Sequence, residues 1–390
     1  SQGVTGWLCS VLTDTPEQTL WCMEQAKRVI EGGPYDGAAL LGIHLEGPCL
    51  SSEYKGAMPE HLLMHTASID LFREYQDASG GHVRYTTLAP EIPGVEELIP
   101  ELNALGITCA IGHSGAGYDQ SMACVRAGAA SATHLGNAMR LFHQHDPAIW
   151  GVAIESDLYV EAICDGRHLH PGSVRLYLKS KGWDRVVAIT DSIMAAGLPD
   201  GNYKLGVNDV VVEDGDAKLA STGVRAGSTL TLAQALRNIV KFADTDVEHA
   251  ARLMTKNPAT LIGFATKGQI ACGYDADLYF DETDFEFIHD FSTYETVSVL
   301  GNASNSISKM VLLDIGRTVR QQERTSKFAK RQNPVYDRAT EEQPRTARKE
   351  IEHHDRGTDL HPDRGVPVSR PDLAGDGGGP AGQARGAAQE

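Results

Sequence analysis

AALLGIHLEGP, residues 38–48, is a run of apolar residues that ends abruptly in a carboxylate and a Gly-Pro pair. A short apolar run bounded by turn residues is typical of a strand buried on both faces of a parallel sheet. Similar runs ending in polar residues occur at 107–115 (ITCAIGHSG), 131–139 (SATHLGNAM) and 186–192 (VVAITDS). Helical patterns separate these runs, and this alternation predicts an α/β fold with a parallel sheet.

Seven strands are expected, whereas a closed (β/α)8 barrel needs eight. Because a strand follows Ser1 almost at once, we expect the missing strand to be the first. The predicted fold is therefore a distorted (β/α)8 TIM-type barrel that lacks its first strand. An open doubly wound sheet is the alternative, but the sequence has no G-x-G-x-x-G turn to favour it. The expected strands lie near 4–11, 39–45, 83–88, 107–112, 130–134, 158–164 and 186–190.

Residues 15–18 (TPEQ) form a capping signature that predicts a helix running to about Ile30. Further helices are expected up to Lys241 and over 246–256, the latter ending at Asn257-Pro258. Residues 268–280 are expected to form a turn and a strand leaving the barrel.

The sequence predicts three regions along the chain. Residues 1–266 would form the barrel, and 267–316 the returning strands of a small β-sandwich remnant. From about Arg317, Gln, Arg, Glu, Pro and Gly dominate. Such a composition cannot bury enough apolar surface to offset chain entropy, so 317–390 are expected to be disordered or of non-native origin.

The charge balance excludes some partners. There are 35 Lys and Arg against 52 Asp and Glu, a net charge of −17, which opposes binding to nucleic acid or an anionic membrane. A phosphorylated substrate would need a local cationic site. The sequence contains no run of 18 apolar residues, which predicts no membrane association.

The cysteines predict a reducing cytoplasm. None of the seven forms a C-x-x-C pair. Four of them lie in apolar runs, where a cysteine is usually a small core residue. These are Cys9, Cys49, Cys109 and Cys164.

Four polar residues stand at the carboxyl ends of predicted strands, where barrel enzymes place their active sites. They are Glu46, His113, His134 and Asp191. Singly, each has a plainer interpretation, as a hydrogen-bonded structural histidine or a helix-capping carboxylate. Together, one carboxylate and two imidazoles suit a zinc-like ion that keeps a position open for water. The further carboxylate can then serve as the base, which predicts metal-assisted hydrolysis.

Seven blocks occur in an order and spacing that resemble one enzyme family, the N-acetylglucosamine-6-phosphate deacetylases of the amidohydrolase superfamily. The resemblance covers roughly residues 3–280. The blocks are HLEGP with KGAMP (44–59), GHSGAGYDQ (112–120), THLGNAM with HDP (133–147), CDGRHLHP (164–171), ITDSIMAAGLPDGNYKLG (189–206), AGSTLTL (226–232) and NPATLIG (257–263).

This resemblance implies specific roles. Glu46, His113 and His134 would bind the metal, and Asp191 would act as general base and then acid. The metal would be zinc, with iron, manganese or cobalt as alternatives. In some relatives a strand that precedes the residues present here adds an H-x-H pair, so either one or two ions are expected. The substrate would be an amino sugar phosphate, hydrolysed to acetate and glucosamine 6-phosphate by a cytoplasmic homodimer.

Two positions depart from the family pattern. Met58 stands in KGAMP where relatives usually have a histidine that contacts the acyl group, and methionine cannot donate that hydrogen bond. His145 stands where relatives usually have an arginine that reaches the phosphate from the neighbouring subunit. We therefore expect weaker and more pH-sensitive phosphate binding. The expected substrate-binding residues are Ala57, Met58, Asn137, Ala138, His145, Asp165, His168, Arg225, Ala226 and Gly227.

Two other functions fit the sequence. One is a truncated chain of the same family that is inactive or only binds the sugar phosphate. The other is a related N-acyl amidohydrolase whose substrate differs, which Met58 and His145 favour and the GHSGAGYDQ and HLGNAM blocks oppose.

Overall fold

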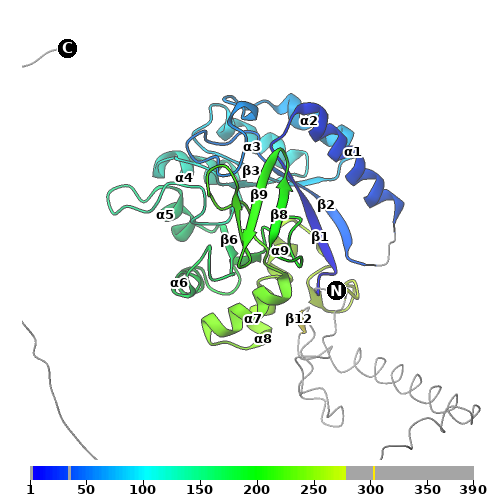
Figure 1. Cartoon of the computed structure of the whole chain (residues 1–390), viewed down its shortest axis with the longest axis vertical. Helices are drawn as coiled ribbons and strands as arrows, with labels where there is room; N and C mark the ends of the chain where they lie inside the picture. Colours follow the sequence, from blue (N-terminus) through cyan, green and yellow to red (C-terminus); the bar gives the residue numbers. More distant parts are fainter. Residues whose placement is uncertain (1–2, 34–36, 278–301, 304–390) are drawn as a thin grey trace, which may run out of the picture. The chain divides into compact units, whose positions relative to one another are not determined.

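The computed structural model describes residues 3–33, 37–277 and 302–303. Its largest sheet has seven parallel strands in sequence order, and each strand pairs with the next. Among the described residues the first and last strands do not pair, so the sheet is a curled TIM-type barrel that is open between β1 and β7. Helices lie around the outside of the sheet (Figure 1). All seven predicted strands are present: β1 (Gly6–Leu12), β2 (Ala39–Glu46), β3 (Val83–Leu88), β4 (Thr108–Ile111), β5 (Ser131–Ala132), β6 (Tyr159–Ile163) and β7 (Val186–Ile189).

Helices connect these strands, and consecutive helices pack against each other from α1 to α8. The predicted start of α1 is confirmed, because the Thr15 side chain accepts a hydrogen bond from the Gln18 amide at 3.2 Å and Pro16 occupies the first turn. The helices are α1 (Pro16–Gly32), α2 (Ile69–Ala78), α3 (Val95–Ala104), α4 (Tyr118–Ala127), α5 (Ala148–Glu155), α6 (Pro171–Lys181), α7 (Leu232–Ala243), α8 (Val247–Arg252) and α9 (Lys256–Leu261), with one 3-10 turn, η1 (Glu60–Leu62).

The core lies between the barrel strands and the helices. Strand residues such as Ile43, Ile111 and Val160 have no solvent exposure, as expected for strands covered on both faces. Cys49, Cys109, Cys124 and Cys164 are also buried, and all seven cysteines are free thiols. The interpretation of Cys49, Cys109 and Cys164 as core residues is confirmed, while Cys9 is half-buried.

The structure after β7 differs from the sequence prediction. A three-stranded antiparallel sheet that was not predicted follows, formed by β8 (Gly201–Leu205), β9 (Asn208–Glu213) and β10 (Asp216–Leu219). It packs its own small cluster of apolar side chains.

The predicted helix end at Asn257-Pro258 is wrong, since α8 ends at Arg252 and Pro258 lies in the first turn of α9. Proline is tolerated there because a first-turn N–H has no helical partner to lose. The Asn257 side chain donates hydrogen bonds to the Trp183 and Val186 carbonyls at 2.7 and 2.6 Å, which ties α9 to β7.

Of the predicted strand at 268–280, the structure has β11 (Gln269–Ile270), which pairs in parallel with β12 (Asn302–Ala303). The proposed domain boundaries remain predictions, and 317–390 lie outside the described residues.

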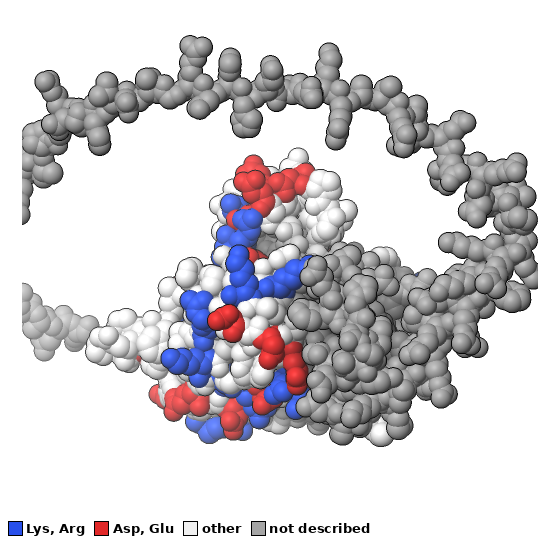
Figure 2. Space-filling view, turned by 90° about the horizontal axis from the view of Figure 1, so that it is seen from below, with Lys and Arg blue, Asp and Glu red and all other residues white. Residues whose placement is uncertain are grey.

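No described helix is both long and apolar enough to cross a bilayer. On the face seen in Figure 2, basic and acidic side chains lie next to one another.

Candidate metal centre and active site

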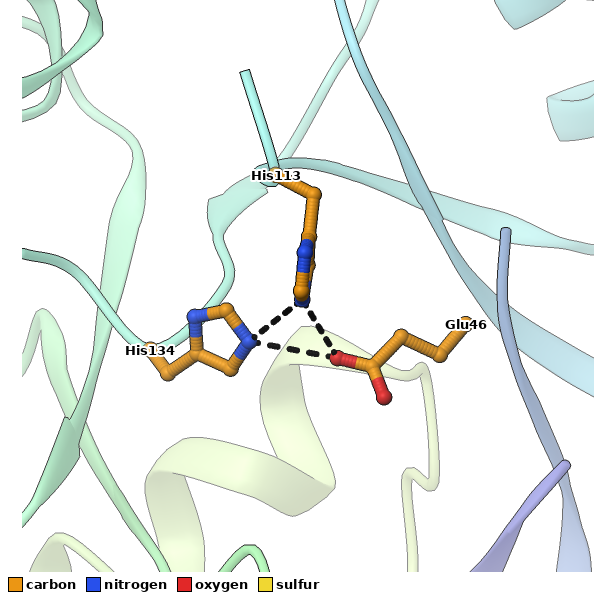
Figure 3. A group of neighbouring side chains, drawn as sticks. All are labelled: Glu46, His113 and His134. Carbon is orange, nitrogen blue, oxygen red and sulfur yellow. Dashed lines mark hydrogen bonds and ion pairs between the residues drawn. The ribbon is translucent and has the colours of Figure 1, made fainter. Parts of the chain in front are cut away.

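Three side chains converge at the carboxyl ends of β2, β4 and β5 (Figure 3). Glu46 is the last residue of β2, and His113 and His134 follow β4 and β5 by two residues each. The Glu46 Oε1, His113 Nε2 and His134 Nε2 atoms lie 3.1 Å from one another. All three side chains are buried. The prediction that these residues come together is therefore confirmed.

The hydrogen bond at the far side of the His113 ring fixes how this ring faces the cluster. His113 Nδ1 lies 2.9 Å from the Tyr54 carbonyl, which can only accept, so Nδ1 carries the proton. In a neutral His113 ring, the Nε2 lone pair then points at His134 and Glu46. Three electron-rich atoms at such short range repel one another unless a proton or a cation lies between them.

This donor set fits a divalent cation. Atoms 3.1 Å apart can all lie at the distances typical of zinc, about 2.0–2.2 Å. Two imidazoles and one carboxylate are a common protein contribution to a catalytic zinc site, where a further position is kept for water. Among the described residues this is the one group of His, Cys, Asp or Glu side chains arranged to bind a metal.

Hydrogen bonds and charges within the cluster shift the pKa values of Glu46 and His134. Burial alone would raise the pKa of Glu46, but the two histidines hold that pKa well below its usual range. Burial alone would lower the pKa of His134, but the hydrogen bond and charge of Glu46 raise it to about 9. A proton on His134 thus supplies positive charge to the buried carboxylate.

Asp191 lies two residues after β7, in the same cavity as the three ligand candidates. Burial and the nearby charge of Glu46 raise the pKa of Asp191 to about 6. A carboxylate with a pKa close to neutral can both accept and return a proton, which is what a general base that later acts as an acid requires.

Three of these four residues have left-handed backbone. The φ angles are 47° at His113, 28° at His134 and 50° at Asp191. Such angles are uncommon for residues other than glycine and cluster at functional sites. At Asp191 the turn also depends on Gly227, because a Cβ there would lie 2.5 Å from Ile193 Cγ2 and 2.9 Å from the Asp191 carbonyl. A tight turn after each strand thus aims the side chain into the barrel.

The cavity has a volume of about 1120 Å³ and extends along the unpaired edges of β1 and β7. Most of the residues expected to bind substrate line this cavity. The exceptions are His145, Asp165 and Ala226. The expected residues that line it are Ala57, Met58, Asn137, Ala138, His168, Arg225 and Gly227.

The three remaining residues lie behind or outside the cavity wall. Asp165 Oδ2 is 2.6 Å from His168 Nδ1, which fixes the ring and leaves Nε2 for another partner. The Ala226 amide donates to the Ala217 carbonyl at 3.0 Å. His145 is exposed, and its ring lies against that of His143 at 5.2 Å between centroids.

Two backbone amides and two cationic side chains line the cavity, and both cations are paired with carboxylates. No described residue accepts a hydrogen bond from the Ala138 or Gly227 amide. Arg225 Nε and Nη2 donate to the two Asp216 oxygens at 2.7 and 3.0 Å, and this pairing lowers the pKa of Asp216 to about 2. Arg225 and Lys267 are the only Lys or Arg side chains among the described residues of the cavity wall, and Lys267 is paired with Asp275 and Asp277.

Met58 belongs to the apolar part of the wall. It is 4% exposed and packs with Leu50 and Leu63. At this position the cavity wall is thus apolar and offers no hydrogen-bond donor.

A buried polar group beneath the ligand cluster was not predicted from the sequence. Glu161 on β6, Tyr85 on β3 and His44 on β2 all face the cavity. His44 Nδ1 lies 2.9 Å from Ser10 Oγ, and burial lowers its pKa to about 4. The sequence did contain a signal for this group, a glutamate within the apolar strand YVEAI. Because burying a carboxylate without a partner is costly, such a glutamate indicates a buried hydrogen-bond partner.

A curled parallel barrel whose strand ends bring two imidazoles and a carboxylate together, next to a second carboxylate, defines a metal-dependent hydrolase. Residues 62–311 match the model of the "Amidohydrolase family". An N-acetylglucosamine-6-phosphate deacetylase of Lysinibacillus sphaericus is 35% identical over 280 residues, which are 71% of each chain.

Solved structures of N-acetylglucosamine-6-phosphate deacetylases are also similar to this chain. That of the Thermotoga maritima N-acetylglucosamine-6-phosphate deacetylase superposes with a TM-score of 0.66 at 35% identity, covering 71% of this chain and 74% of that one. A Mycobacterium smegmatis deacetylase variant, in complex with N-acetyl-D-glucosamine-6-phosphate, gives 0.64 at 34% identity and covers 67% and 69%. The chain belongs to the amidohydrolase family and, within it, to the N-acetylglucosamine-6-phosphate deacetylases.

Proposed function

We propose that the chain hydrolyses the acetamide of N-acetylglucosamine 6-phosphate to glucosamine 6-phosphate and acetate. The observation that carries the proposal is the 3.1 Å triangle of Glu46, His113 and His134 in one cavity with Asp191. When bound to these three residues, a divalent cation lowers the pKa of water and polarises the acetyl carbonyl. The two imidazoles and one carboxylate favour zinc.

Asp191 carries the proton in this proposal. It accepts a proton from the attacking water while the water oxygen bonds to the acetyl carbon, and it gives that proton to the amine nitrogen as the C–N bond breaks. Its pKa of about 6 suits both steps. The proposed products are acetate and the free amino sugar phosphate, and Asp191 ends the cycle ionised.

The substrate is proposed to lie with its acetyl methyl against Ala57 and Met58. The Ala138 and Gly227 amides, Asn137, His168 and Arg225 would hold the sugar phosphate. Asp165 would orient His168 through the 2.6 Å hydrogen bond. Because His145 lies outside its own cavity, it would need a second copy of the chain to reach a phosphate.

We infer a homodimer, which the exposed Leu141 and Phe142 in the same loop as His145 also favour. The seven free thiols agree with a reducing cytoplasm.

The purified chain loaded with zinc is expected to release acetate from N-acetylglucosamine 6-phosphate in proportion to glucosamine 6-phosphate. Both products are measured, the sugar by chromatography and acetate by a coupled assay. N-acetylglucosamine without phosphate should react with a far higher KM, since it loses the charged contacts. A folded, zinc-loaded chain that turns over neither compound would contradict the proposal and favour a chain that only binds.

Replacing Arg225 by Gln is expected to raise KM for the phosphorylated substrate about 10- to 100-fold, because a hydrogen bond to a charged group contributes about 1.5–3 kcal/mol. The kcat should change little. Lys218→Gln is the matched control, since Lys218 also contacts Asp216, at 3.2 Å, but does not line the cavity. Equal losses for the phosphorylated and unphosphorylated sugars would show that Arg225 only supports the fold.

A further inference from the structure

Glu161 is a buried carboxylate directly beneath the ligand cluster, and it is not one of the proposed ligands. It is 4% exposed and lies in the middle of β6. Both of its carboxylate oxygens are engaged: Oε1 accepts a short hydrogen bond from the Tyr85 hydroxyl, and Oε2 accepts one from the His134 amide at 3.2 Å. Its backbone carbonyl accepts a further hydrogen bond from the Leu135 amide at 2.9 Å. Glu161 therefore holds two successive amides of the segment that carries His134.

Tyr85 fixes the Glu161 side chain from across the barrel. It lies on β3, which is not a neighbour of β6 in the sheet, so this hydrogen bond crosses the barrel interior. Tyr85 is 5% exposed, and water has little access to compete for the bond. The carboxylate is thus restrained at both oxygens.

His134 needs such support more than His113 does. The His113 ring is held by the hydrogen bond from Nδ1 to the Tyr54 carbonyl. In contrast, His134 Nδ1 is buried and has no hydrogen-bond partner among the described residues. The orientation of the His134 ring therefore depends on its backbone, and that backbone has a strained φ of 28°. A strained conformation persists only where the surroundings hold it.

We infer that Glu161, held by Tyr85, is a positioning residue that fixes the metal ligand His134 through its backbone amide. This inference rests on the proposed function, in which His134 binds the cation. Without the carboxylate, the His134 amide would lose its acceptor, and the backbone would relax toward an ordinary φ. The Nε2 atom would then move out of the triangle with Glu46 and His113, and the site would bind metal less tightly.

Three variants of the full chain test the inference with Zn²⁺ alone, by competition against a chromophoric chelator. Glu161→Met removes both acceptor oxygens and is expected to weaken zinc binding about 10- to 100-fold, the usual effect of losing an outer-shell partner. Glu161→Gln keeps an oxygen for the His134 amide and a group for Tyr85, so it should restore most of the affinity. A Gln variant as weak as the Met variant would overturn the hydrogen-bond explanation.

Tyr85→Phe is an independent test in case Glu161→Met does not fold. It removes the hydrogen bond to Glu161 and should weaken zinc binding several-fold. Its matched control is Thr86→Val, which removes a buried hydroxyl on the same strand, whose 3.2 Å hydrogen bond to the Leu45 carbonyl does not involve Glu161. If the role of Tyr85 were only structural, Tyr85→Phe and Thr86→Val would have equal zinc affinities, and this result would overturn the inference. Zinc binding is measured without substrate, so failure of the deacetylase proposal would appear separately, as absent acetate release.

Discussion

Replacing Asp191 by Asn is expected to lower kcat for acetate release by about 10²- to 10⁴-fold, the usual contribution of a general acid or base. Asparagine has nearly the same size but cannot accept the proton from water at neutral pH. Since Asp191 is not one of the three triangle residues, the variant should bind zinc with nearly unchanged affinity. Acetate release and zinc content are both measured on the same preparation. Asp209→Asn, a surface carboxylate paired with Lys204, is the control.

The pH profile gives a second readout of the same residue. Asp191 must be ionised to act as a base, and burial with the charge of Glu46 raises its pKa to about 6. The rate should therefore be full above about pH 7 and fall as the pH drops through this pKa. A bound cation stabilises the ionised form, so the acidic limb of the loaded enzyme should lie at or below pH 6. An Asn variant that kept the full rate and the same acidic limb would remove Asp191 from the mechanism.

The candidate site could be predicted because parallel barrel strands end at one face. Glu46, His113, His134 and Asp191 each follow an apolar run, so their convergence is a consequence of strand direction. The sequence could not indicate the left-handed turns that aim three of them inward, since His and Asp do not mark such turns as glycine does.

Elements that depend on tertiary context were missed. Glu161 was overlooked because its importance depends on which face of β6 points into the barrel and on Tyr85, 76 residues away along the chain. Pro258 was taken as a helix end because proline is common both just after a helix ends and in the first turn of the next helix. The hairpin strands β8 to β10 are short and half-exposed, so their alternation is weak.

Zinc content and the rate of acetate release, measured together, distinguish a metal ligand from the general base. In the Asp191 variant the ion should stay and the proton transfer should fail. In a variant of the triangle the ion itself should be lost, and the rate would fall for that reason. Measuring both quantities in both variants therefore separates the two roles.

Replacing Glu46 by Gln is expected to weaken zinc binding by more than about 100-fold, beyond the 10- to 100-fold typical of outer-shell changes. The carboxylate is the one negative charge among the three donors, and its Oε1 lies 3.1 Å from both imidazole nitrogens. An amide of the same shape keeps the packing but leaves two buried imidazoles to bind a dication without charge compensation.

Acetate release by the Glu46→Gln variant should fall with zinc content, and a large excess of zinc should restore part of it. Glu60→Gln, an exposed glutamate in η1, should change neither quantity. Zinc content is measured by atomic absorption after dialysis, beside acetate release at saturating substrate. If the Gln variant kept its zinc and its rate, Glu46 would have no part in the site. The hydrolase mechanism would then need a different donor set, because no other group of potential ligands is arranged for a metal among the residues that the structure describes.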